Sequence, residues 1–253
     1  LIQNKEINSL ELEGIKDQRL RVFPAGLAIL IGIFEALEIG VMEYSDGALR
    51  EGALHDLLGR AQHEDVRETT VSAMQSRFLA DANHAKKVKE TALKLYMQVC
   101  QKWKIADTAY QDYLRWSADL HEIGLAIAHS HHHKHGAYLV QHSDMSGFSK
   151  LAQESVAMIL RGHKRKLPLQ ELDALPKRNR KILSRLMIIL RLSVLLHNGR
   201  GISDVIDPTI EIEKSTITLS FPEDFLKNHA MTEMDLERET TYLNHVGLEL
   251  EFS

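Results

Sequence analysis

Apolar side chains recur at three- and four-residue spacing almost without interruption between about residues 63 and 197. This spacing matches one face of an α-helix, which completes a turn about every 3.6 residues. Acidic, amide, glycine and proline residues interrupt the pattern, and the expected helices are 64–79, 84–103, 108–128, 148–160 and 178–196. The fold is therefore expected to be mainly α, with a helical domain over residues 61–207.

The first 60 residues follow a different pattern. Pro24 precedes an apolar segment that ends near Gly40, which predicts a helix with proline in its first turn. A short strand is expected over 41–44, and a glycine turn then leads into a second helix over 48–58. Helix, strand, turn and helix form an α/β pattern with too few strands for a sheet, so the remaining strands are expected upstream of Leu1 or elsewhere.

The pattern changes again after residue 207. Residues 209–213 and 215–219 alternate between polar and apolar side chains, as strands joined by a short turn do. A helix over 231–244 and a final strand over 248–252 are expected to follow. We therefore assign residues 208–253 to a small α+β domain.

The composition excludes several classes of protein. The 253 residues are 44% hydrophobic and 26% charged, which is typical of globular domains and not of disordered or disulfide-stapled chains. The single cysteine, Cys100, has no partner for an internal disulfide, which favours a reducing compartment. No apolar run is long enough for an integral membrane segment. We expect a cytoplasmic location, with peripheral association at a membrane as the alternative.

Fourteen histidines are the most unusual feature of the composition, and many of them lie between residues 121 and 142. Imidazoles with adjacent carboxylates are typical ligands of divalent transition metals. His121 beside Glu122, His132 four residues before Gly136, and His163 further on resemble the spacing of the HD metal-phosphohydrolase superfamily. The sequence therefore predicts a helical domain of HD ancestry.

Two departures from that superfamily argue against a working metal site. Glu122 stands where the metal-bridging aspartate is expected, and no late aspartate is found in 192–196. A dinuclear site depends on the geometry of both carboxylates. We predict that His121, Glu122, His132 and His163 occupy degenerate positions whose histidines are structural or face a polyanion. A working metal site and incidental surface histidines are the alternatives.

A basic segment stands out in a chain whose net charge is −4. The segment from 161 to 191 contains ten basic residues and only two acidic ones. The basic residues are Arg161, Lys164, Arg165, Lys166, Lys177, Arg178, Arg180, Lys181, Arg185 and Arg191. Phosphate polymers favour several cations along a line, because every phosphate carries negative charge. No aromatic residues are interleaved, so we expect no nucleic-acid partner. A phosphate-binding surface and an ordinary solvated helix face are both compatible with the pattern.

The segment 45–52 is a second candidate for binding phosphate. A glycine turn at Gly47 before a helix N-terminus offers backbone N–H groups to an anion. Arg50, in the first turn of that helix, is placed to add a bidentate contact. By itself, a turn of this kind is weak support for a site.

Two long motifs lie in the first 60 residues, RVFPAGLAIL at 21–30 and SDGALREG at 45–52. Shorter motifs follow at 120–125, 135–139, 143–148 and 190–192. Together they resemble the exopolyphosphatase / guanosine pentaphosphate phosphohydrolase family, over almost the whole chain. The resemblance implies that 1–60 is the C-terminal end of the second lobe of an actin-like fold, followed by an HD-like domain over 61–207 and the small domain over 208–253.

The resemblance also implies a parent enzyme that hydrolyses phosphoric anhydrides. Its catalytic carboxylates and its Mg²⁺ site are expected upstream of Leu1, so no catalytic residue is expected in this chain, and a start without methionine agrees with a fragment. Substrate binding is assigned to Gly47, Arg50, Arg161, His163, Lys164, Arg165, Lys166 and Arg178. A homodimer is expected, because apolar helix faces remain that a single core does not need.

The substrate is open between two members of the family. Removal of terminal phosphate from inorganic polyphosphate is the main interpretation, because the cation-dense segment 161–166 suits a long polymer that is held away from its reacting end. Hydrolysis of guanosine pentaphosphate at its 5′ phosphate is the alternative. A free-standing HD-type metal phosphohydrolase and a non-catalytic binding and dimerisation module are further alternatives.

Overall fold

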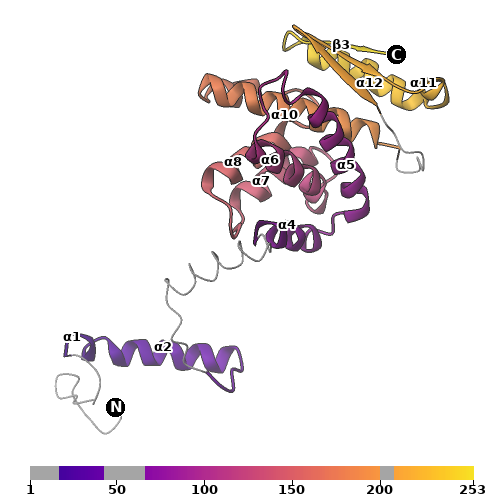
Figure 1. Ribbon diagram of the computed structural model, residues 1–253. Helices are drawn as coiled ribbons and strands as arrows, with labels where there is room; N and C mark the ends of the chain where they lie inside the picture. The colour runs from indigo at the N-terminus through magenta and orange to yellow at the C-terminus, as the bar shows by residue number, and fades with distance from the viewer. Residues whose placement is uncertain (1–16, 43–65, 200–207) are drawn as a thin grey trace. The chain divides into compact units, whose positions relative to one another are not determined.

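The computed structural model describes residues 17–42, 66–199 and 208–253 (Figure 1). The chain divides into two compact units, Leu1–His55 and Asp56–Ser253. The described residues are mainly helical, and a small three-stranded sheet lies near the C-terminus. None of their helices is both long and apolar enough to cross a lipid bilayer.

Among its described residues, 17–42, the first unit contains two helices, α1 (Asp17–Leu20) and α2 (Phe23–Ala36). The expected helix with proline in its first turn is confirmed, although α2 ends four residues before Gly40. Val41 and Met42 are not part of a strand. The rest of the predicted strand over 41–44, the predicted helix over 48–58, and the candidate residues Gly47 and Arg50 all lie outside the described residues.

Among the described residues, the helical part of the second unit has eight helical elements. They are α4 (Val66–Arg77), α5 (Ala82–Val99), α6 (Thr108–Leu120), the 3₁₀ helix η2 (Ile123–Ala126), α7 (His132–His142), α8 (Lys150–Gly162), α9 (Leu169–Asp173) and α10 (Lys177–Leu196) among the described residues, with residues 63–65 outside them. Side-chain caps define three of the starts: Asp81 accepts from the N–H groups of Asn83 and His84, Asp107 from that of Ala109, and Ser149 from that of Ala152. These caps explain why the periodic pattern predicts most helix starts correctly.

One predicted helix is too long. The pattern over 108–128 predicts a single helix, but α6 ends at Leu120, and α7 forms where no helix is predicted. The cause is a close backbone approach at Gly124: a Cβ atom there would lie 2.0 Å from the carbonyl oxygen of His132. Only glycine permits this contact, which brings the start of α7 against the segment that follows His121.

The core of the second unit is centred on α10, which contacts α5, α6 and α8. Thirteen of its twenty residues are buried, including the charged residue Arg191. A helix that is apolar on nearly every side is typical of the centre of a helical domain. The helices α5, α6 and α8 therefore pack against α10 to form the core.

The C-terminal part is an α+β unit, as the sequence predicts. The strands β1 (Thr209–Glu213), β2 (Thr216–Ser220) and β3 (Glu249–Phe252) lie in the order β1-β2-β3, antiparallel between β1 and β2 and parallel between β2 and β3. The helices α11 (Phe225–Asn228) and α12 (Ala230–Asn244) make the crossover to the parallel strand (Figure 1). Contacts of α5 with β1 and of α10 with α12 attach this part to the helical part.

Candidate functional site: a histidine cluster beside a basic cavity

His121 lies at the C-terminal end of α6 and is almost completely buried. Its Nδ1 atom is 2.7 Å from the carbonyl oxygen of Ala118. Because a carbonyl oxygen only accepts, Nδ1 carries the proton and Nε2 carries the lone pair. Burial lowers the pKa of His121 to about 3, so the ring is neutral at neutral pH. The Nε2 atom is buried and has no hydrogen-bond partner.

His163, at the C-terminal end of α8, repeats this arrangement. Its Nδ1 atom is 2.7 Å from the carbonyl oxygen of Leu160, and its buried Nε2 atom also has no partner. Burial lowers the pKa of His163 well below its usual value. His132, at the start of α7, is held by the carbonyl oxygen of His129 at 3.3 Å. In all three, the peptide carbonyl three residues earlier fixes the tautomer.

These rings form one histidine cluster with neighbours from other helices. Ring centroids are 5.5 Å apart between His84 and His121, 5.9 Å between His121 and His163, and 5.7 Å between His163 and His132. The cluster consists of His84, His121, His132, His133, His163 and His197. The structure thus brings together the three histidines that the sequence assigns to HD positions.

His84 is a member that the sequence reasoning missed. The Asp81 cap places His84 in the first turn of α5, and that signal is visible in the sequence. What the sequence does not show is that the start of α5 lies against the end of α6. There the Nε2 atom of His84 is 3.9 Å from Oε1 of Glu122.

His84, His121 and Glu122 bring their donor atoms to one place, because the three atoms lie within 4.8 Å of one another. Across residues 17–42, 66–199 and 208–253, this is the one group of three histidine, cysteine or carboxylate side chains with that spacing. Two imidazoles and one carboxylate form a ligand set that suits a divalent transition metal.

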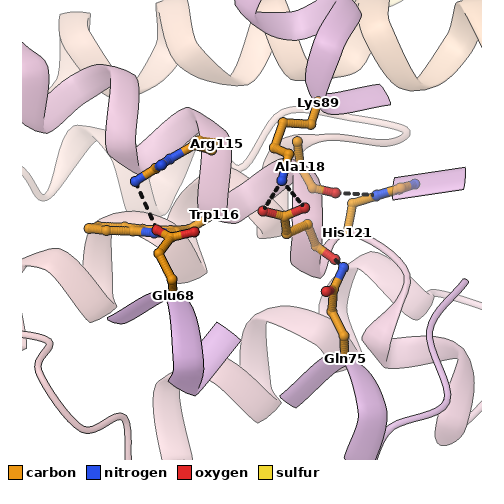
Figure 2. A network of polar contacts seen from close by, with 8 residues as sticks. Glu68, Gln75, Lys89, Arg115, Trp116, Ala118 and His121 are labelled. Carbon is orange, nitrogen blue, oxygen red and sulfur yellow. Dashed lines mark hydrogen bonds and ion pairs between the residues drawn. The ribbon is translucent and has the colours of Figure 1, made fainter. Parts of the chain in front are cut away.

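A polar network holds the end of α6 that carries His121 (Figure 2). The carboxylate of Asp119 lies 2.9 Å from Nζ of Lys89 on α5, and its backbone carbonyl accepts from Nε2 of Gln75 on α4 at 2.8 Å. One turn earlier, Glu68 of α4 accepts from the indole N–H of Trp116 at 2.6 Å. These contacts anchor α6 to two helices, so the position of His121 is set by the fold.

A basic cavity of about 350 Å³ lies next to the cluster. It is lined by residues after α8, on α10 and on α12: His163, Lys164, Arg165, Arg191, Val194, Leu195, Asn198, Asp235, Arg238, Glu239 and Tyr242. Lys164 influences both the cavity and the cluster. Burial lowers its pKa, and the charges of Asp235 and Glu122 oppose that shift. The cavity therefore combines cations that are open to a ligand with a deeply buried ion pair.

Arg191 and Glu239 form that ion pair. Nε and Nη2 of Arg191 lie 2.6 and 2.8 Å from the two carboxylate oxygens of Glu239, and Nη1 donates to the carbonyl oxygen of Gly162 at 2.7 Å. Burial raises the pKa of Glu239, although Arg191 opposes this shift. Each of the three guanidinium nitrogens of Arg191 donates to an acceptor in the protein. Arg191 is therefore not open to a phosphate ligand.

The structure does not bring the predicted substrate-binding residues into one line. His163, Lys164 and Arg165 line the basic cavity, but Lys166 and Arg178 do not. Arg161 binds Glu171 at 3.1 Å and lines a separate, more apolar cavity of about 370 Å³.

Other cations of the basic segment also have partners inside the protein. Arg180 binds the carboxylate of Asp173, and Arg185 donates to the carbonyl oxygen of Trp103. The charge that is open to a ligand is therefore smaller than the ten cations in the sequence indicate.

Comparison with protein families gives two matches that together cover most of the chain. Residues 66–240 match the Ppx/GppA phosphatase, domain III, and residues 1–61 match the Ppx/GppA phosphatase family. The histidine cluster and the basic cavity are formed by residues between His84 and Tyr242, and so lie almost entirely within the first match.

Curated relatives extend over nearly the whole chain. The chain is 33% identical over 247 residues to a protein of Photobacterium profundum, covering 97% of this chain and 49% of the relative. It is 36% identical over 242 residues to one of Vibrio vulnificus (95% and 48%) and 33% identical over 241 residues to one of Aeromonas salmonicida (95% and 49%). All three are named guanosine-5′-triphosphate,3′-diphosphate pyrophosphatase. The chain spans about half the length of the curated relatives it matches.

Proposed function

Because the chain belongs to the Ppx/GppA phosphatase family, we propose that it is the C-terminal portion of an enzyme that hydrolyses guanosine-5′-triphosphate,3′-diphosphate and releases its terminal 5′ phosphate. The resemblance inferred from the sequence motifs is confirmed at the level of the family. The names of the curated relatives favour the nucleotide, which the sequence reasoning held as the alternative, over inorganic polyphosphate.

Within this chain, the arrangement of the cations supports a compact phosphate ligand. Lys164 and Arg165 face a compact cavity of about 350 Å³, whereas Arg161 and Arg191 are paired with carboxylates. A short phosphate group needs two or three cations in one place, and charge-assisted hydrogen bonds from lysine and arginine suit it. A long polymer would need a continuous line of open cations, which these ion pairs interrupt.

The role proposed for this chain is to hold the substrate away from the reacting phosphate. Binding energy from remote parts of a substrate lowers the barrier when it helps to orient the reacting group. The catalytic carboxylates and the Mg²⁺ site belong, in this proposal, to the part of the parent enzyme outside this chain. Mg²⁺ would supply neutralisation of charge on the phosphoryl oxygens when bound.

The predicted domain division, homodimer and cytoplasmic location remain part of the proposal. Residues 1–60 would be the end of an actin-like lobe, 61–207 an HD-like domain and 208–253 the small α+β domain. Cys100 is a buried free thiol, which agrees with a reducing compartment. Exposed apolar side chains such as those of Met97 and Leu151 are compatible with contacts to a second copy.

Inorganic polyphosphate is the second candidate substrate. Lys164, Arg165 and Lys166 are consecutive cations, and Lys177, Arg178 and Lys181 add positive charge at the start of α10. A polymer carries more phosphates than the two cavity cations neutralise, so its binding would need these further cations. The two substrates are separated by comparing their turnover with the full-length enzyme.

The experiment uses the full-length enzyme with Lys164→Gln and Arg165→Gln combined, and Lys150→Gln as the matched control on the opposite end of α8. Loss of charge-assisted hydrogen bonds worth about 1.5–3 kcal/mol should raise KM for the nucleotide about tenfold to a hundredfold. The control variant should leave KM unchanged. Faster turnover of long-chain polyphosphate than of the nucleotide, or an unchanged KM in the double variant, would contradict the proposal.

A further inference from the structure

We propose that His84, His121 and Glu122 bind one divalent transition-metal ion, of which Zn²⁺ is the natural example, between the start of α5 and the end of α6. This inference rests on the described side chains of this chain and does not depend on the proposed hydrolysis of a nucleotide. It reverses the sequence-based prediction that the positions around His121 hold no metal.

The distances fit a single ion. The three donor atoms lie within 4.8 Å of one another, and Nε2 of His84 is 3.9 Å from Oε1 of Glu122. Zinc–nitrogen bonds of 2.0–2.1 Å place two donors on a tetrahedral ion about 3.3 Å apart and two imidazole centroids about 5 Å apart. The centroids of His84 and His121 are 5.5 Å apart, so small torsional changes bring the donors to an ion.

The unpartnered nitrogen of His121 is a second, independent indication. Buried side-chain nitrogens are nearly always hydrogen-bonded, because a buried polar atom without a partner costs about 1–3 kcal/mol. Nε2 of His121 is buried without a partner, while Nδ1 donates to the carbonyl oxygen of Ala118. Metal-binding histidines commonly show this division, with one nitrogen on a backbone carbonyl and the other on the metal.

A purely structural histidine would explain these observations less well. Such a residue normally uses both ring nitrogens in hydrogen bonds when it is buried. The Nε2 atom of His197, for example, is hydrogen-bonded to the hydroxyl of Thr91 at 2.8 Å. The Nε2 atom of His121 instead lies within 4.8 Å of a potential ligand atom of His84 and of Glu122. The side chain of Glu122 is 12% exposed and that of His84 is 10% exposed, so an ion from solvent has access to the group.

The missing aspartates do not exclude this site. The sequence argument against a metal concerned a dinuclear centre, in which a bridging aspartate has to hold two ions. A single ion needs no bridge, and two imidazoles with one carboxylate satisfy it while leaving a position for water or an anion. Lys164 adds positive charge beside Glu122, which favours an anion at that open position.

The test is a Co²⁺ titration of the full 253-residue chain after removal of metal with a chelator. The proposal predicts about one Co²⁺ per chain, with the visible absorption of a four- or five-coordinate ion, and displacement by Zn²⁺. His121→Gln and Glu122→Gln should each lower the affinity at least tenfold. His245→Gln is the matched control, because His245 is exposed at the C-cap of α12 and also donates to a backbone carbonyl.

Circular dichroism establishes which variants are folded, and Glu122→Gln carries the comparison if His121→Gln is not. The wild-type titration tests the site without any substitution. Absence of bound Co²⁺ and Zn²⁺ from the folded wild-type chain would overturn the proposal. Equal affinity in the wild type and in folded Glu122→Gln would overturn it as well.

Discussion

Two neighbouring residues at the end of α8 belong to two differently built polar regions. The carbonyl oxygen of Gly162 accepts from Arg191, whose other donors are taken by Glu239, so that region is internally complete. The next residue, His163, keeps a buried nitrogen without a partner, and so does His121. Since buried polar groups are normally satisfied, the difference separates a structural ion pair from a cluster with capacity for a ligand.

The cations of the basic segment also differ in whether a carboxylate balances their charge. Arg191 counts toward the positive charge of the sequence, but its charge is balanced by a carboxylate 48 positions away in the chain. Lys164 and Arg165 line the same cavity without such a carboxylate clamp among the described residues. A ligand of the cavity is therefore expected to depend on these two cations and not on the more deeply buried arginine.

The largest expected effect on the free energy of unfolding is at the Arg191–Glu239 ion pair. Glu239→Ala leaves the buried guanidinium of Arg191 without its counter-charge, so we expect the free energy of unfolding to fall by about 3–5 kcal/mol. Urea denaturation measures this loss. Glu237→Ala, at an exposed position on the same helix, is the control and should change stability by less than about 0.5 kcal/mol. A loss below about 1 kcal/mol for Glu239→Ala would show that the ion pair is not a structural element.

A smaller effect is expected at the backbone contact that closes the histidine cluster. Gly124→Ala places a Cβ atom against the backbone of His132, so α7 has to move, and we expect a loss of about 1–3 kcal/mol. Gly136→Ala is a matched control, because a Cβ atom there would lie 3.6 Å from its nearest neighbours, in ordinary van der Waals contact. Thermal or urea unfolding of both variants measures the difference, and equal stabilities would contradict the role given to Gly124.

The smallest effect is the pH dependence of the metal-free cluster. Burial, with the charges of His132 and Arg161, lowers the pKa of His133 to about 3. Below about pH 6.5 the unfolded chain therefore binds a proton at His133 that the folded chain does not, so stability falls as the pH falls. The loss from one such group approaches about 1.4 kcal/mol per pH unit.

His133→Gln removes that contribution. In the presence of a chelator, its free energy of unfolding should fall by about 1–2 kcal/mol less than that of the wild type between pH 6.5 and pH 5. Urea denaturation at several pH values measures this. His245→Gln, at an exposed position, serves as the control. Parallel pH profiles for the wild type and His133→Gln would contradict the assignment.

Local patterns predicted much of the fold, because helix periodicity, capping residues and strand alternation all lie within short segments. The start of α5 at Ala82, two residues before the predicted start, and the alternation in β1 and β2 are examples. The break after Leu120 could not be predicted in this way. The apolar pattern continues through Ile123, and the cause of the break is a contact between Gly124 and His132 that exists only in the folded chain.

The candidate site was predictable only in part for the same reason. Spacing identified His121, His132 and His163, but the place of His84 depends on how α5 lies against α6. Counting charges also overestimated the basic surface, because Glu239 reaches Arg191 from α12 and Asp173 reaches Arg180 from α9. Side-chain partners that are distant in sequence decide which charges and lone pairs stay open to a ligand.

If the donor atoms of His84, His121 and Glu122 bind an ion, Zn²⁺ should raise the melting temperature of the chelator-treated chain. An ion that binds the folded chain at a hundred times its Kd adds about 2.7 kcal/mol of stability. We predict a clear rise in the wild type and in His245→Gln, and a clearly smaller rise in Glu122→Gln, whose affinity is expected to fall at least tenfold. The same melting temperature with and without Zn²⁺ in the wild type would contradict the account.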